Sequence, residues 1–292
     1  MQTFETRDPI SVELEIGVGD IDIEASERAE TTVEVRPTDP RKKGDVMAAE
    51  QTRVEYANGR LTVKGPSGWR QWLPRRGSES VDVRVSLPTG SDVRAQLGVA
   101  SLHGRGRLGE VNGKLGVGDV QFDETGPLNL RTGAGDIALD RAAGRAEVVT
   151  HSGAVRIGTI EGIAAVKNSN GNTWIGEVAG DARVSAANGS ISVDRADEGI
   201  VAKTANGGVR LADVAHGAVV AQSALGDIEI GVRDGVAAWL QLDTKFGRVR
   251  NDLDPSERPA ASEEVVEVHA STSMGDVVIR RASATHAGSE AP

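Results

Sequence analysis

GPLNLRTGAGDIALDRAAG, residues 126–144, carries the pattern that decides the fold. Within this stretch two short runs alternate apolar and polar residues, and each run is followed by a glycine. Counted from Gly135, apolar or small residues stand at −7, −5, −3, +2, +4 and +7: Leu128, Leu130, Thr132, Ile137, Leu139 and Ala142. A period of two places these side chains on one face of two short strands, with turns at the glycines.

The same unit recurs along most of the chain at a nearly constant spacing. Each copy has a glycine, then a small or acidic residue, then an apolar-x-apolar run. The copies begin at Gly118, Gly135, Gly153, Gly171, Gly189, Gly207, Gly226, Gly247 and Gly275, in steps of 17, 18, 18, 18, 18, 19, 21 and 28 residues. A second series keeps the same step: Gly126, Gly144, Gly162, Gly180, Gly199, Gly217 and Gly235. Self-similarity at a fixed period indicates a repeat protein, and the alternation makes it all-β.

Two architectures fit this pattern. In a hairpin meander, Asn188-Gly189 would form a two-residue turn. In a parallel β-solenoid, each unit of about 18 residues is one coil, stacked on the next at about 4.8 Å. The constant period favours the solenoid, because stacked coils do not tolerate insertions. The column before the glycine agrees, since Ser152, Asn170, Asn188 and Asn206 would stack as a ladder of polar side chains. The handedness of the coil stays open.

The sequence divides into three regions. Residues 1–92 form an N-terminal β region, in which Val12 to Ile23 match the repeat once. The other strand-like segments there are Thr31 to Arg36, Arg53 to Tyr56, Leu61 to Lys64 and Val81 to Leu87, with a hairpin turn at Asn58-Gly59. We predict that this region caps the first coil, whose strand edges would otherwise be unpaired. Residues 93–281 are the solenoid repeats, with an excursion from Asn251 to Glu264 before the last coil. Residues 282–292 are predicted to be a disordered tail.

This order of motifs resembles a known family. The stretch VELEIGVGDIDI at Val12 to Ile23, the Ser-Leu-Pro strand end at Ser86 to Pro88, and the G-D-[VI]-x-[VIL] repeats that follow are similar to the DUF4097 family of bacterial β-strand-repeat proteins. The resemblance covers nearly the whole chain and implies a β-solenoid of unknown function. Members of the family often carry the label "putative adhesin". The composition and the lack of an anchor resemble the actinobacterial cytoplasmic members.

Composition and charge argue against several classes of function. The chain of 292 residues has no Cys, which excludes disulfides and Cys-ligated metals. Its formal net charge of −10 argues against nucleic-acid binding, which needs concentrated Lys and Arg. No stretch has the roughly 18 apolar residues of a membrane span, and residues 1–10 lack the features of a secretory signal. We therefore expect a cytoplasmic protein without a cofactor.

The Gly-x-Gly-Asp motifs invite a calcium interpretation, but Asp occurs once per coil and is replaced in the middle coils. We interpret these motifs as turns, in which Gly supplies a positive φ and Asp or Asn bonds its own backbone. The five His residues have neither metal-ligand spacing nor a paired carboxylate. They are His103, His151, His216, His269 and His286. No catalytic, cofactor or metal residue is assigned. Two acidic pairs, Asp194 with Asp197 and Glu110 with Asp119, are the only carboxylates considered for a glycosidase or lyase.

One segment differs from its surroundings. Gly68 to Gly77 reads GWRQWLPRRG and places two Trp and three Arg in an acidic chain. The segment either plugs one end of the solenoid or contacts a partner, because Trp and Arg dominate interface hot spots. The candidate partner-binding residues are Trp69, Arg70, Trp72, Arg75 and Arg76.

The sequence therefore favours a non-enzymatic solenoid scaffold that binds a protein of unknown identity or self-associates. The alternative is a carbohydrate-binding protein or carbohydrate-active enzyme on a β-helix scaffold. Clustered aromatic rings and carboxylates on one face would favour the alternative. The sequence does not indicate whether any small molecule binds.

Overall fold

A computed structural model describes residues 1–66, 79–253 and 265–282, and the fold is a parallel β-solenoid, as the repeat predicts. The chain divides into two compact units, Met1–Gly162 and Ile163–Pro292. Among the described residues one helix is present, and it is neither long nor apolar enough to cross a membrane. The predicted boundary at residue 92 stays a prediction.

The described residues of the N-terminal unit form one helix and thirteen strands. They are β1 (Gln2–Glu5), β2 (Ser11–Ser26), β3 (Glu30–Pro37), α1 (Lys43–Gln51), β4 (Arg53–Ala57), β5 (Arg60–Lys64), β6 (Val81–Pro88), β7 (Asp92–Arg107), β8 (Val111–Val117), β9 (Val120–Thr125), β10 (Leu128–Ala134), β11 (Ile137–Ala142), β12 (Ala146–Ser152) and β13 (Val155–Ile160).

The first coil of this unit is covered as the sequence predicts. The long strand β2 pairs in parallel with β7 on one side, and with β5 and then β6 on the other. Antiparallel strands close the outer edge: β4 pairs with β5, β3 with β6, and β1 with β3. The hairpin turn between β4 and β5 lies at Asn58 and Gly59, whose φ angles of 51° and 74° suit it. The predicted capping region is thus confirmed.

Helix α1 was not predicted. The buried residues of α1 are Asp45 and Ala48, so no apolar stripe with a helical period marks it in the sequence. The Asp45 carboxylate accepts hydrogen bonds from the backbone N–H groups of Asp39 (3.1 Å) and Ser80 (3.1 Å). A buried carboxylate with these partners fixes the helix against the loops beside β3 and β6.

The described residues of the C-terminal unit form twelve strands. They are β14 (Ala164–Asn170), β15 (Thr173–Val178), β16 (Ala182–Asn188), β17 (Ile191–Ala196), β18 (Ile200–Asn206), β19 (Val209–Val214), β20 (Ala218–Leu225), β21 (Ile228–Val232), β22 (Ala237–Phe246), β23 (Val249–Asn251), β24 (Val265–Met274) and β25 (Val277–Arg281).

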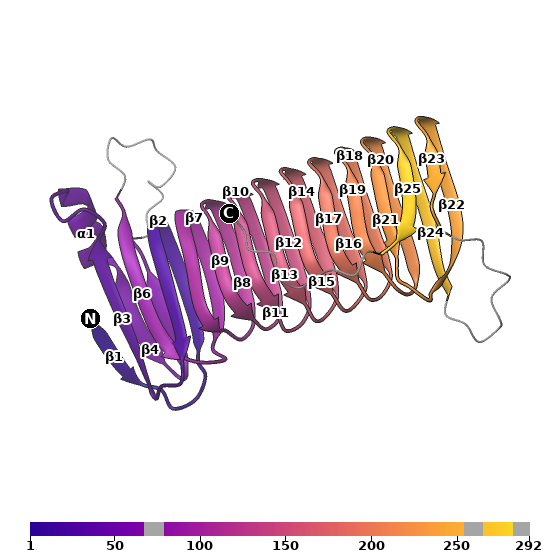
Figure 1. Cartoon of the computed structure of the whole chain (residues 1–292). Coiled ribbons are helices and arrows are strands. Elements are labelled where there is room, and N and C mark those ends of the chain that lie inside the picture. The colour runs from indigo at the N-terminus through magenta and orange to yellow at the C-terminus, as the bar shows by residue number, and fades with distance from the viewer. Residues whose placement is uncertain (67–78, 254–264, 283–292) are drawn as a thin grey trace. The chain divides into compact units, whose positions relative to one another are not determined.

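The last coils of this unit are stacked out of sequence order. The coil of β24 and β25 pairs with β20 and β21 on one side, and with β22 and β23 on the other. Figure 1 shows the yellow β24–β25 coil lying between the orange coils that precede it in the chain. The sequence predicted an excursion before the last coil. The coil of β24 and β25 is the last one along the chain, but in the stack it lies between two other coils. Residues 254–264, including Pro255 and Pro259, lie outside the described residues, as do residues 283–292 of the predicted tail.

Inward positions of the repeat form the core. The six residues assigned around Gly135 are all buried. Around Gly189, Ala182, Val184, Ile191, Val193 and Ala196 are buried, and Ala186 is half-buried. The register confirms the stacking, because Ile191 lies between Thr173 and Val209 at the same position of the neighbouring coils. Small and branched aliphatic side chains therefore build the core in thin layers.

Each repeat turn depends on a glycine with an unusual backbone. Gly189 has a φ of 144°, a region that essentially only glycine occupies. A methyl group on its Cα would overlap the carbonyl oxygen of Gly171 in the preceding coil. The predicted positive φ is confirmed, and the stacking distance adds a second reason for glycine.

The acidic residue after the glycine does not act as predicted. It bonds the backbone of the next coil in space instead of its own. Asp119 Oδ1 accepts from the N–H of Asp136 (2.8 Å), and Asp136 Oδ1 from that of Ala154 (2.7 Å). In the C-terminal unit Asp227 accepts from Asp276 N (2.8 Å), and Asp276 from Arg248 N (2.8 Å). The acidic residue thus connects neighbouring coils. Its hydrogen-bond partner lies in the coil that is adjacent in space, even where that coil is not the next one along the chain.

Candidate interaction surface

The partner-binding residues proposed from the sequence, Trp69, Arg70, Trp72, Arg75 and Arg76, all fall in residues 67–78, outside the described residues. Their role as cap or contact therefore stays a prediction. The described residues contain a hollow, several polar clusters and a group of exposed apolar side chains.

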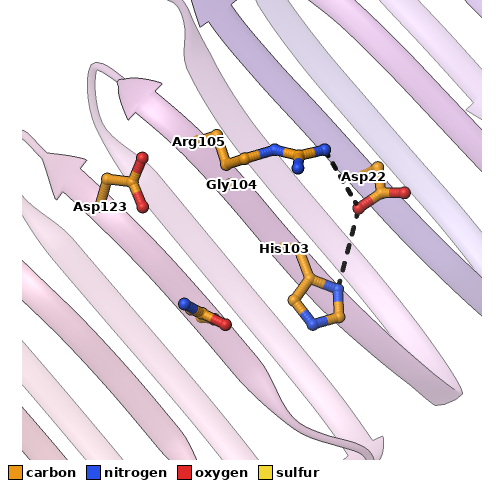
Figure 2. Close-up of a pocket in the computed structure, with 6 residues that line it drawn as sticks. Asp22, His103, Gly104, Arg105 and Asp123 are labelled. Atoms are coloured by element: carbon orange, nitrogen blue, oxygen red, sulfur yellow. Dashed lines mark ion pairs between the residues drawn. The ribbon is translucent and has the colours of Figure 1, made fainter.

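An open hollow of about 270 Å³ lies on the outer face of β2, β7 and β9. Figure 2 shows Asp22 opposite His103 and Arg105, with Asp123 on the far side of the hollow. Asp22 Oδ1 is 4.0 Å from His103 Nδ1 and 3.9 Å from Arg105, and Asp123 accepts the N–H of Gly106 at 2.8 Å. General acid–base catalysis uses contacts of about 2.6–3.2 Å, and no Ser, Thr or Lys lines this hollow. Asp22, His103, Arg105 and Asp123 therefore form a loosely spaced polar cluster that is open to solvent.

The acidic pairs considered for catalysis serve structural contacts. Asp194 accepts the indole N–H of Trp174 at 3.0 Å, and Asp197 accepts from Arg195 and Arg233, each at 3.0 Å. Glu110 accepts from the side chain of Asn112 at 2.7 Å, and Asp119 holds the inter-coil bond described above. Carboxylates occupied in this way are poorly placed to serve as a free general acid and base.

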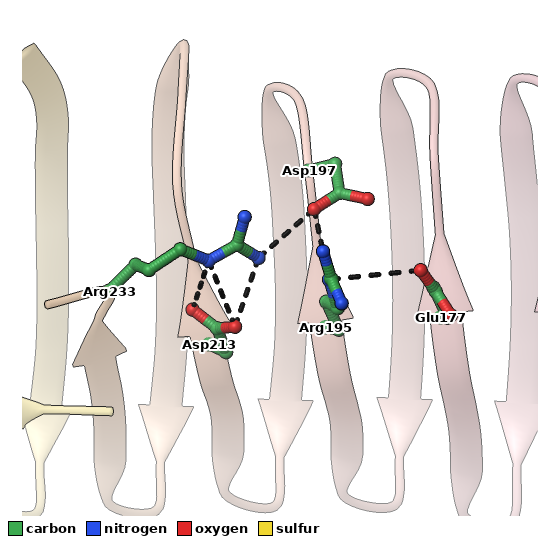
Figure 3. Close-up of polar contacts among 5 residues, drawn as sticks. All are labelled: Glu177, Arg195, Asp197, Asp213 and Arg233. Carbon is green, nitrogen blue, oxygen red and sulfur yellow. Dashed lines mark hydrogen bonds and ion pairs between the residues drawn. The ribbon is translucent and has the colours of Figure 1, made fainter. Parts of the chain in front are cut away.

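Asp197 belongs to a row of alternating charges across neighbouring coils (Figure 3). Arg233 donates to both oxygens of Asp213 (2.9–3.1 Å) and to Asp197, while Arg195 lies between Asp197 and Glu177 (3.7 Å). Burial alone would raise the pKa of Asp197, but the hydrogen bonds from Arg233 and Arg195 outweigh it and lower that pKa. The hydrogen bond to Asp213 is the main reason that the pKa of Arg233 is raised. These hydrogen bonds and ion pairs tie consecutive coils together.

Two of the histidines do have a neighbouring carboxylate, contrary to the sequence-based prediction. His103 lies near Asp22, as described, and His269 Nε2 is 2.9 Å from Glu267 Oε1. Alternation makes residues two apart share a face, so the pair Glu267 and His269 could have been read from the sequence. Among the described residues, no group of three or more His, Asp or Glu side chains is placed to hold a metal ion.

The column of residues before the repeat glycine changes character along the C-terminal unit. Asn188 donates to Asn170 at 2.9 Å and Asn206 to Asn188 at 2.7 Å, which confirms the predicted polar ladder. The next three coils continue the column with apolar side chains that are 48%, 54% and 72% exposed: Leu225, Met274 and Phe246. We call these three residues the apolar stripe.

The coil of β22 and β23 exposes positions that are buried in the coils before it. Val219 and Val268 are fully buried, yet Leu240 in the same column is half-buried. Likewise Val277 is buried, and Val249 beside it is 46% exposed. Among the described residues β22 pairs with β24 alone, so its other edge has no strand beside it. These inward-facing side chains are exposed because no further coil among the described residues covers them.

On the outer face of the same coils, Trp239 is 52% exposed and meets the ring of His269 edge-on, at 5.4 Å between centroids. Glu267 lies opposite Trp239 in the register. Clustered aromatic rings and carboxylates would favour a carbohydrate-binding face, and here a single indole, Trp239, lies beside a single carboxylate, Glu267. Sequence analysis did not single out Trp239 or the apolar stripe, although the change from Asn to Leu, Met and Phe in one column was visible.

The chain is similar to one protein family and to several solved structures. The family profile described as Toastrack DUF4097 matches residues 10–286. Among solved structures, a "putative adhesin" from Parabacteroides distasonis is 13% identical, with 95% of each chain covered and a TM-score of 0.39. A "putative adhesin" from Bacteroides fragilis is 14% identical, over 96% of this chain and 95% of that one, with a TM-score of 0.39. A "putative cell adhesion protein" from Clostridium sporogenes is 10% identical, over 96% and 98%, with a TM-score of 0.24. No curated protein matches the chain.

Proposed function

The chain belongs to the Toastrack DUF4097 family, and we propose that it is a non-enzymatic β-solenoid scaffold that binds a protein partner. The apolar stripe carries this proposal. Six of the large apolar side chains that are exposed lie on β20, β22, β23 and β24: Leu225, Trp239, Phe246, Val249, Val265 and Met274. Apolar side chains gathered in this way mark interaction sites more often than scattered ones do.

The polar clusters support the non-enzymatic part of the proposal. No Ser, Thr or Lys lines the hollow at His103, its Asp22 and His103 are 4.0 Å apart, and the four candidate carboxylates accept structural hydrogen bonds. The similar solved proteins bear names that refer to adhesion, which is an interaction and not a reaction.

Site-specific photo-cross-linking tests the proposal. A photoreactive phenylalanine analogue at Phe246 is expected to form a protein adduct in the cells that make this protein. The matched control carries the analogue at Asn188, which lies in the same column on the polar ladder and is expected to form none. Equal labelling at both positions, or no protein adduct at Phe246, would refute the proposal.

A carbohydrate-binding role is the second candidate, and the exposed Trp239 beside Glu267 and His269 favours it. Indole faces with neighbouring polar groups suit sugar rings. Titration of the protein with a panel of oligosaccharides, followed by tryptophan fluorescence, tests this role, with Trp239→Ala as the control. The absence of any Trp239-dependent change would remove it.

The cytoplasmic location and the likeness to actinobacterial members remain proposals from the sequence. Fractionation of the producing cells, with detection of this chain in each fraction, tests the location.

A further inference from the structure

We propose that the open edge of β22 binds the β22 strand of a second copy of this chain, antiparallel and about a two-fold axis. This inference rests on the proposed function, because it names the protein partner. The observation that carries it is the uncovered coil of β22 and β23, in which Leu240, Leu242 and Val249 occupy columns that are buried in the preceding coils.

An open strand edge offers a row of backbone N–H and C=O groups, and such edges pair with other strands unless they are protected. Strand β22 is ten residues long and pairs along one side only within the described residues. Two identical edges can meet about a two-fold axis only if the strands run antiparallel. A second copy would therefore continue the sheet beside the exposed inward residues at the C-terminal end of β22.

The charges on β22 are self-complementary in one register. Side chains of opposite residues in an antiparallel pair lie on the same face, so the two-fold axis must pass through a residue. If it passes through Thr244, Asp243 of one copy lies opposite Lys245 of the other, and this happens twice. The same register sets Leu242 opposite Phe246, whose side chain is 72% exposed. Both charged residues are exposed on the outer face of the strand.

Acidic and basic residues on an edge strand can also serve to keep copies apart. The two roles differ in what a change of charge does. If the pairs form, Asp243→Lys sets two lysines opposite two lysines, and Lys245→Asp sets four carboxylates together. Either variant alone then repels itself, while a mixture of the two restores both ion pairs in a heterodimer.

Sedimentation velocity over a wide range of concentrations tests the inference with the full chain. The parent is expected to form a dimer, and each single variant is expected to dissociate with a dissociation constant raised by about tenfold or more. An equimolar mixture of the two variants, and the doubly swapped Asp243→Lys/Lys245→Asp chain, are expected to dimerise as the parent does. Thermal melts verify that all variants fold.

A parent that stays monomeric at every concentration would overturn the inference, as would single variants that dimerise like the parent. Cross-linking at Phe246 separates this failure from failure of the proposed function. An adduct with a different protein, or one formed by residues 254–264 or 283–292 of the same chain, would exclude the second copy. An adduct with a different protein would leave the scaffold proposal standing. The absence of any adduct would refute both the scaffold proposal and the dimer.

Discussion

Replacing Gly189 with Ala tests the stacking geometry at a single point. Gly189 has a φ of 144°, and an added methyl carbon would lie 2.6 Å from the carbonyl carbon of Gly171 in the neighbouring coil, closer still to its oxygen. The backbone of the neighbouring coil cannot move aside without breaking its own ladder. Both the torsion and the overlap therefore oppose the substitution.

The two costs can be separated within the same unit. Gly235 also has a positive φ, of 81°, but no atom lies within 4 Å of the position that its methyl group would take. Left-handed torsion for Ala costs about 1–2 kcal/mol, and the reduced freedom of the unfolded chain offsets about 0.4–1 kcal/mol of this. At Gly189 the torsion lies in a region almost restricted to glycine and costs about 1–3 kcal/mol before the overlap is counted.

Thermal melting followed by circular dichroism measures the difference. With about 2–4 °C per kcal/mol, Gly235→Ala should lower the Tm by at most about 6 °C. Gly189→Ala should lower it by about 5–10 °C or more, because the overlap adds to the torsion. If Gly189→Ala melts within about 2 °C of the parent or above Gly235→Ala, the stacking of glycine on glycine is wrong.

Four further predictions concern the core, the metals, the acid response and the uncharacterised Trp segment. Ile191→Asp places a carboxylate in a layer where Ile191 is 1% exposed, at a cost of several kcal/mol, and should abolish cooperative unfolding, whereas Ala187→Asp on the exposed face should not. Excess chelator should leave the Tm unchanged, because the Gly-Asp turns are not expected to bind a structural ion. A bound ion would raise the Tm by mass action, so a fall of many degrees in chelator would contradict this prediction. The pKa of Asp197 is lower in the folded state than its ordinary value of 3.8, so its contribution is complete above that value and is lost as the pH falls through the lowered pKa. Asp197→Asn should therefore flatten the loss of stability in acid, seen as urea midpoints below about pH 4. Trp69→Ala/Trp72→Ala should lower the Tm and promote association if these residues cap the solenoid, while an unchanged melt and a monodisperse sample would indicate a contact site.

The coils themselves could be predicted almost residue by residue. Alternation at period two specifies the inward face, and the phase-locked glycines specify the turns, so the burial of residues such as Leu130 and Ile137 follows from local pattern alone. The cap was predictable for the same reason, since β3 to β6 keep the alternation. Helix α1 was not, because it is held by one buried carboxylate and not by an apolar face.

Long-range order was harder to predict than local structure. Nothing in the alternation distinguishes a coil that is stacked in sequence order from one inserted beside it, so the place of β24 between β20 and β22 could not be derived. The destination of the turn carboxylates was missed for a related reason. A residue such as Asp227 bonds a backbone group 49 residues away, and only the stacked coils bring that group within reach.

The inward side chains of β22 suit a strand that is covered on its open edge by a second polypeptide. In the C-terminal unit the column that ends at Leu242 contains Val166, Val184, Ala202, Ala221 and Ala270, and all five are buried. Ala stands in this column in the three coils that precede Leu242 in the stack. Leu242 is larger and lies on the coil whose edge is open among the described residues, where a larger apolar side chain exposes more surface to water. Solvent at that face would favour a polar residue in its place, whereas a second copy of the strand would bury it and balance Asp243 against Lys245.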